Sequence, residues 1–135
     1  MSVTVHTRSV EIDAPVEIVS AYVGNAGNLP LWTKFFLEVG DLRQGRHAVD
    51  TVLGPAQTWI ESRVEPGRSL CAICSIINGS LEKAEVTLVP GETTTHLDFT
   101  IRLPDPLPRE LVENRLRILQ EELSDLKVLL ERAYA

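Results

Sequence analysis

The sequence predicts an α+β fold in which a curled antiparallel sheet packs against one long C-terminal helix. Turn residues recur at intervals of about 8–12 residues between positions 36 and 103, and each interval is one strand long. The turn signals are Gly45, Gly54-Pro55, Pro66-Gly67, Asn78-Gly79 and Pro90-Gly91. From position 108 a helical pattern runs to the C-terminus. Because sheet and helix must bury their apolar faces against each other, a curled sheet leaves room for a ligand pocket between them.

Length and composition exclude several classes of protein. The 135 residues suit a single domain spanning 1–135, and a hydrophobic content of 44% argues against disorder. The formal net charge is −6 without a cluster of Lys or Arg, which argues against nucleic acid and anionic membranes as partners. No apolar stretch suits membrane insertion and no signal peptide is recognisable, so we expect a cytoplasmic protein.

Metal and nucleotide chemistry have no supporting pattern. The three histidines are scattered, and neither a P-loop nor a dinucleotide glycine motif occurs. Cys71 and Cys74 form a C-x-x-C, but they lie in an apolar strand, where residues three apart point to opposite faces. We therefore expect no metal, no cofactor and two structural cysteines.

The N-terminal third predicts one strand and two short helices. Residues 3–12 alternate as a strand, Asp13 is suited to cap a helix over 16–23, and Pro15 suits its first turn. A second short helix or turn, rich in large apolar residues, covers 29–36. Six meander strands are then expected at 36–43, 47–53, 56–64, 69–77, 81–89 and 93–103.

The last helix is predicted over 108–134, with Asp105 as its cap and Pro106 and Pro108 in its first turn. Its apolar positions are Val112, Leu116, Leu119, Leu123, Leu126, Leu130 and Ala133. This stripe fits a core helix lying on the sheet, which we favour because a sheet is available in the same chain. The same spacing also fits a coiled-coil seam, so a homodimer or a partner helix stays open.

The order of these elements, together with the run Ser9-Val10-Glu11-Ile12-Asp13-Ala14-Pro15-Val16-Glu17-Ile18-Val19 and the later Trp32, resembles the START-like (SRPBCC) superfamily. That resemblance implies a helix-grip fold: a seven-stranded antiparallel sheet wrapped around a long C-terminal helix, with two short helices between strands 1 and 2. The superfamily includes polyketide aromatase/cyclases, plant pathogenesis-related allergens, and lipid or quinone carriers.

Two segments are similar to the bacterial polyketide cyclase/dehydrase branch. Residues 32–36 resemble the segment whose tryptophan lines the cavity, and residues 59–64 resemble the strand that carries a cavity arginine, which places Arg63 at that position. Where those enzymes have a catalytic tyrosine seven residues after the tryptophan, this chain has Val39. The expected proton donor is therefore missing.

The strand at 56–64 carries the candidate catalytic residues. Alternation puts Trp59, Glu61 and Arg63 on one face, opposite Thr58 and Ile60. If the first face points inward, Glu61 becomes a candidate general base and Arg63 a candidate ligand for a carbonyl or enolate oxygen. If it points outward, both are ordinary solvated charges. The resemblance at Arg63 and the size of Trp59 favour the inward orientation.

The expected ligand site draws on several elements. Aromatic residues are only 5% of the chain, so those that converge from separate elements are expected to surround a void rather than fill it. Tyr22 is a candidate hydroxyl donor, although a half-buried tyrosine is the default interpretation. Arg115 could reach into the pocket, but an arginine at the flank of a helix usually extends to water. His96 and Asp98 resemble a dyad, but they lie opposite the apolar face of their strand. The candidate ligand-binding residues are Trp32, Phe35, Phe36, Trp59, Phe99, Tyr22, Arg115 and Leu119.

The sequence thus predicts a protein that binds a small hydrophobic or aromatic, polyketide-like molecule. Cyclisation or dehydration of that molecule is one function, assisted by Glu61 and Arg63. A non-catalytic carrier or sensor is the alternative, and an interaction module using the C-terminal helix is a third. The absence of a tyrosine at position 39 favours binding over catalysis.

Overall fold

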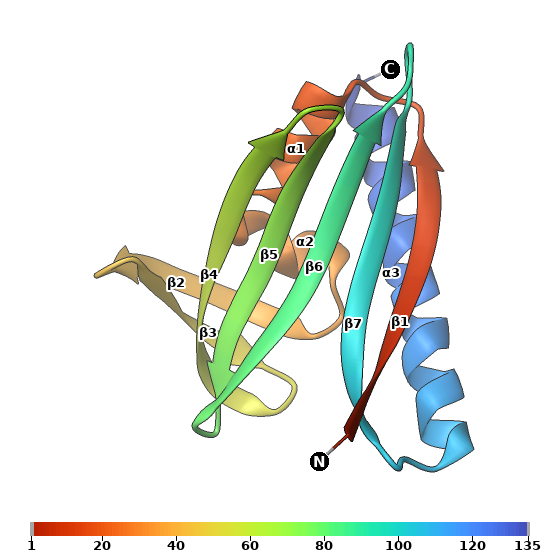
Figure 1. Cartoon of the computed structure of the whole chain (residues 1–135). Coiled ribbons are helices and arrows are strands. Elements are labelled where there is room, and N and C mark those ends of the chain that lie inside the picture. The colour runs from red at the N-terminus through yellow and green to blue at the C-terminus, as the bar shows by residue number, and fades with distance from the viewer. Residues whose placement is uncertain (1, 135) are drawn as a thin grey trace.

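A computed structural model describes residues 2–134 and shows one seven-stranded antiparallel sheet with helices covering one of its faces (Figure 1). The strands follow the order β1-β7-β6-β5-β4-β3-β2, so the chain forms a meander whose last strand pairs with the first. Their bounds are β1 (Ser2–Ile12), β2 (Phe36–Arg43), β3 (Arg46–Thr51), β4 (Gly54–Glu65), β5 (Arg68–Ile77), β6 (Ser80–Pro90) and β7 (Thr95–Asp105). The predicted helix-grip fold is confirmed.

The turns lie where the Gly and Pro signals placed them. Asn78 and Gly79 both have positive φ, 50° and 78°, as a two-residue type I′ hairpin requires. The β2–β3 pairing contains two register shifts, and such irregularities bend a strand. In Figure 1 these two strands run across the direction of the others, so the sheet curls at this end.

The short helices differ from the prediction at their ends. The first, α1 (Val16–Val23), has Pro15 at its N-cap, and Pro15 makes no side-chain capping hydrogen bond. The predicted cap Asp13 instead donates its backbone N–H to Glu131 of the last helix, at 2.7 Å. The second helical segment consists of a 3-10 turn, η1 (Ala26–Asn28), and the single turn α2 (Leu29–Trp32). It ends earlier than expected because the chain becomes extended at Thr33 and enters β2 at Phe36.

The long helix α3 (Arg109–Tyr134) lies on the helical side of the sheet. Asp105 does not cap it, because Asp105 is the last residue of β7 and pairs with Ser2. The carbonyl of Pro108 instead accepts the backbone N–H groups of Leu111 and Val112. The buried apolar residues of α3 are Leu119, Leu123, Leu126 and Leu130. The sheet therefore occupies the face that a coiled coil would have needed.

The core lies between the sheet and the helices. It combines the buried alternate residues of β5, β6 and β7 with the apolar faces of α1, α2 and α3. Cys71 and Cys74 are both buried and free, as expected for structural cysteines. Within residues 2–134, no helix has both the length and the apolar character needed to cross a membrane.

Candidate ligand cavity

A cavity of about 490 Å³ lies between the inner face of the sheet, the segment joining α2 to β2, and α3. Its apolar wall is formed mainly by aromatic and branched side chains. These are Phe35, Phe36, Ile73, Ile77, Phe99, Ile101 and Leu103. Such a volume and lining are typical of sites for small organic molecules.

The alternation of the strands explains this wall. On β5, Ile73, Ser75 and Ile77 share the inner face, and on β7 Phe99 and Ile101 do the same. Ser75 adds a polar atom, but its hydroxyl is already hydrogen-bonded to that of buried Thr58 at 2.8 Å. The sheet therefore presents the cavity with a largely apolar surface.

The cavity opens where β6 and β7 part. The two strands are paired only from Glu85 and Thr100 to Pro90 and Thr95, and they diverge beyond that point (Figure 1). Lys83 and Arg102 border the cavity although their neighbours Ala84 and Ile101 point inward. Consecutive strand residues point to opposite faces of the sheet. Because the cavity contacts both the inward-pointing and the outward-pointing residues, it passes between β6 and β7. This gap is an entrance from the outer face of the sheet.

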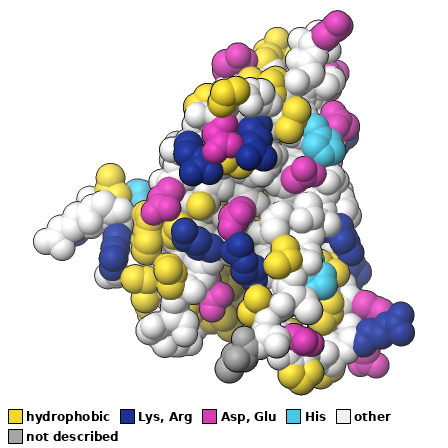
Figure 2. All heavy atoms as spheres, viewed as in Figure 1, with side chains coloured by type: hydrophobic (Ala, Val, Ile, Leu, Met, Phe, Trp, Pro, Cys, Tyr) yellow, Lys and Arg dark blue, Asp and Glu magenta, His cyan; other side chains and the backbone are white. Residues whose placement is uncertain are grey.

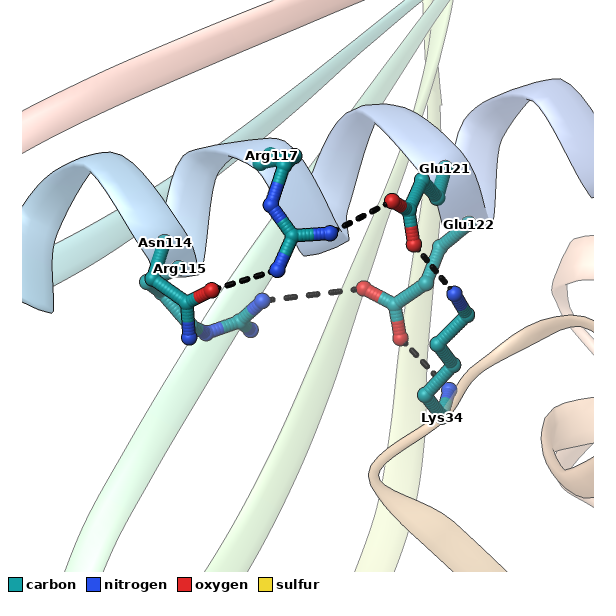
Figure 3. A network of polar contacts seen from close by, with 6 residues as sticks. All are labelled: Lys34, Asn114, Arg115, Arg117, Glu121 and Glu122. Carbon is teal, nitrogen blue, oxygen red and sulfur yellow. Dashed lines mark hydrogen bonds and ion pairs between the residues drawn. The ribbon is translucent and has the colours of Figure 1, made fainter.

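The opposite end of the cavity is polar and is built by α3. Arg115 and Glu122 both border the cavity, and Arg115 Nη1 lies 3.6 Å from Glu122 Oε1 (Figure 3). Glu122 Oε2 accepts the backbone N–H of Lys34 at 2.7 Å. This hydrogen bond ties the α2–β2 segment to the helix at the cavity wall.

Glu122 is 4% exposed, and its burial raises the pKa of its carboxyl group. The Lys34 N–H and the Arg115 guanidinium oppose that shift because both stabilise the carboxylate. A buried carboxyl group beside a cationic partner is a common feature of functional sites. The cavity thus combines an apolar body with a hydrogen-bonding end at Arg115 and Glu122, in addition to the polar residues at its entrance.

A second set of charges surrounds this end on the exposed side of the helix. The Lys34 ammonium group bonds Glu121, which also accepts from Arg117 at 2.7 Å. Figure 3 shows this chain of contacts beside the Arg115–Glu122 pair. The Lys34 side chain is therefore directed to Glu121, and only its backbone serves Glu122.

Four of the predicted ligand-binding residues border the cavity: Phe35, Phe36, Phe99 and Arg115. Trp32 and Leu119 belong to the buried core beside it, with Trp32 packed edge-to-face on Phe99 at 5.9 Å between ring centres. The indole Nε1 of Trp32 is buried without a hydrogen-bond partner among residues 2–134. Tyr22 is half-buried against the core, and its burial raises the pKa of its hydroxyl group.

The expected inward orientation of Glu61 and Arg63 is wrong. Thr58 and Ile60 face the core, which turns Trp59, Glu61 and Arg63 to the outer face of the sheet. The Arg63 side chain is 70% exposed and pairs with Glu65 at 2.9 Å. Trp59 donates its indole N–H to Glu61 and stacks under Arg46. Figure 2 shows charged side chains spread over this outer face.

The prediction missed Glu122, which is the one charged residue in the buried class among those described. Its position carried a signal. Glu122 lies between Leu119 and Leu123 in the apolar stripe of α3, where a charge is unusual unless it has a buried role. Reading the stripe for interruptions as well as for periodicity would have identified it.

His96 and Asp98 lie on the outer face, as expected. His96 bonds Glu11 through Nδ1 and Asp98 through Nε2, the latter at 2.9 Å. The hydrogen bond with Glu11 raises the pKa of His96, and the one with Asp98 adds to that effect. The cluster is on the side of the sheet away from the cavity, so it cannot act on a ligand held there.

Comparison with known proteins identifies the family. A family model described as polyketide cyclase / dehydrase and lipid transport matches residues 4–131. The chain belongs to this family. A search of curated proteins returns no significant match.

Solved structures share the fold of the family at low sequence identity. A START superfamily protein from Mycobacterium smegmatis has a TM-score of 0.62 at 16% identity, covering 96% of each chain. The Zhui aromatase/cyclase from a Streptomyces species has a TM-score of 0.69 at 15% identity, covering 97% of this chain and 95% of its own. A conserved protein from Geobacillus kaustophilus has a TM-score of 0.68 at 10% identity, covering 98% of each chain. Family and fold together indicate a START-like domain for hydrophobic ligands.

Proposed function

We propose that the protein binds one small hydrophobic or aromatic, polyketide-like molecule in the cavity and carries or senses it without chemical change. The observation that supports this most is the cavity of about 490 Å³. Its wall includes the three phenylalanine rings of the chain, at positions 35, 36 and 99. Burial of an apolar ligand against such a wall is favourable by about 25 cal/mol per Å² of apolar surface removed from water.

The placement of the candidate catalytic residues supports a carrier over a cyclase. Glu61 and Arg63 lie on the outer face, separated from the cavity by the sheet itself. Val39 is half-buried against the core, where a tyrosine would have supplied a proton. A general acid or base must come within hydrogen-bonding distance of the proton that it transfers. Neither Glu61 nor Arg63 meets that condition for a ligand in the cavity.

A pair of matched variants tests the cavity as the binding site. Ala84 borders the cavity, whereas Ala72 lies on the next strand and on the opposite face, beside inward-pointing Ile73. Ala84→Phe should fill the cavity and weaken binding of an apolar fluorescent probe at least about tenfold, which corresponds to 1.4 kcal/mol. Ala72→Phe adds the same ring outside and should leave probe binding near the wild-type value.

Native mass spectrometry of the purified protein is the complementary experiment. A small molecule that co-purifies with the wild type and is lost from Ala84→Phe would support the proposal. A ligand whose mass changes during incubation with the protein would show turnover and contradict the carrier function. Equal probe binding by Ala84→Phe and Ala72→Phe would reject the cavity as the binding site.

A further inference from the structure

The polar end of the cavity contains hydrogen-bonding capacity that the protein does not use. Glu122 Oε2 accepts the Lys34 N–H, whereas the one polar partner of Oε1 among residues 2–134 is Arg115 Nη1 at 3.6 Å, which is too long for a hydrogen bond. Among residues 2–134, Arg115 makes no other ion pair. A guanidinium donor and a carboxylate acceptor therefore face the same corner of an apolar void, side by side and loosely joined (Figure 3).

A neutral hydroxyl group complements this corner. The oxygen of a hydroxyl group accepts a hydrogen bond from the Arg115 guanidinium. Its O–H group donates a second hydrogen bond to the Glu122 carboxylate. Both bonds are charge-assisted, and such bonds are shorter and stronger than those between neutral groups. An ether or a ketone satisfies only Arg115 and leaves Glu122 Oε1 without a partner.

We infer that Arg115 and Glu122 select a neutral hydroxyl-bearing hydrophobe, such as a phenol, and reject an organic acid. This inference rests on the proposed function, since it names the class of ligand that the cavity takes. An acid bound at this end would place its carboxylate beside that of Glu122. Two carboxylates at one buried site repel each other, so one of them would have to take up a proton.

The other charged residues at the cavity do not reverse this preference. Lys83 lies 3.9 Å from Glu61, and Arg102 pairs with Glu85 at 3.0 Å. Both cations border the entrance on the outer face and have their own carboxylate partners. Glu82 also borders the cavity but is exposed, so water screens its charge. The α3 end of the cavity is thus set by buried Glu122 and by Arg115, whose side chain is 36% exposed.

Three probes with one ring system test the inference. 2-Naphthol accepts and donates, 2-methoxynaphthalene only accepts, and 2-naphthoate is an anion at pH 7. Equilibrium dialysis against the purified full-length protein measures the dissociation constant of each. We expect wild-type protein to bind 2-naphthol about tenfold more tightly than either of the others.

Glu122→Gln keeps an amide oxygen for the Lys34 N–H and removes the negative charge. It should raise the affinity for 2-naphthoate relative to 2-naphthol at least about tenfold. The matched control is Glu121→Gln, one residue earlier on α3, whose carboxylate bonds Lys34 and Arg117 away from the cavity. The control should keep the wild-type order of the three probes.

The outcomes separate the two proposals. If the wild type binds 2-naphthoate as tightly as 2-naphthol, or if both glutamine variants shift the ratio equally, the selection of a hydroxyl group is wrong while cavity binding stands. If no probe binds the folded wild type, the proposed function itself fails. The wild-type order tests the inference even if Glu122→Gln folds poorly, which far-UV circular dichroism would reveal.

Discussion

At the scale of single residues, Glu122 couples the cavity to the stability of the fold. Burial raises its pKa above the ordinary value of 4.5, so the folded protein holds this proton at a pH where the unfolded chain has lost it. The contribution of Glu122 to the free energy of unfolding therefore falls as pH rises from about 4.5 through the higher pKa of the folded state. Below that window the group contributes no pH dependence, because it is protonated in both states.

Glu122→Gln should remove this dependence. Urea unfolding of the wild type and the variant at pH 4 and pH 7 measures the effect. We expect the variant to gain stability relative to the wild type between the two pH values, because only the wild type must ionise a buried carboxyl group. Tyr22→Phe serves as a control, since its pKa is also raised by burial but lies far above this range. A difference between wild type and variant that stays constant with pH would contradict the assignment.

A substitution at Arg63 tests whether this residue lies outside the ligand site. Its side chain is 70% exposed, and its ion pair with Glu65 is of the surface type, which is worth about 0–1 kcal/mol. Arg63→Leu should change the free energy of unfolding by less than about 1 kcal/mol and leave probe binding unaltered. Isothermal titration with 2-naphthol and a denaturation curve suffice for the comparison. A large loss of binding would return this residue to the ligand site.

At the scale of elements, α3 contributes one buried stripe and one solvated face. Leu119 is fully buried, whereas Leu111 near the start of the same helix is 56% exposed. Leu119→Ala should lower the free energy of unfolding by about 2–5 kcal/mol, as large-to-small changes in cores do. Leu111→Ala, with the same chemical change, should cost less than about 0.5 kcal/mol. Similar losses in the two variants would mean that the stripe does not lie on the sheet.

The bounds of the strands were predictable from sequence patterns, but the orientation of one strand was not. Gly and Pro signals predicted the six strands from β2 to β7 to within a few residues, because turn conformations depend on local backbone preferences. Strand β1 was predicted from its alternating pattern. The orientation of β4 was not predictable in this way. Its inner face carries Thr58 and its outer face carries Trp59, so hydrophobicity alone indicated the wrong side. Thr58 is buried because Ser75 on β5 satisfies its hydroxyl group, and that partner is 17 residues away.

In the candidate site, too, local patterns predicted some residues, whereas others are fixed by contacts with distant parts of the chain. The phenylalanines of the cavity were predictable because they lie in apolar segments of recognisable elements. The position of Glu122 at the cavity wall depends on Lys34, which is 88 residues distant and bonds it through a backbone N–H. No periodicity encodes such a contact. Arg115 was identified as a candidate only because it flanks the same helical stripe.

At the scale of the whole molecule, the sheet has two regimes of pairing. Within the described part of the chain, residues 85–88 of β6 pair with strands on both sides, whereas residues 80–84 pair only with β5. Native-state hydrogen exchange should therefore be faster in 80–84 than in 85–88, because singly paired segments open more easily. Addition of a saturating ligand should slow exchange in 80–84 most, since this segment borders the entrance. Uniform protection along β6 would contradict an entrance at this place.

The pairing of β1 with β7 has a consequence for how the chain folds. Eleven residue pairs join these strands, from Ser2 with Asp105 to Ile12 with Thr95. Strand β1 is synthesised before the other six strands of this sheet, and its partner β7 is the last of them. Contacts so distant along the chain carry a large loop-closure entropy and form slowly. Strand β1 should therefore join the sheet late in folding, because its partner β7 is made only after the other strands.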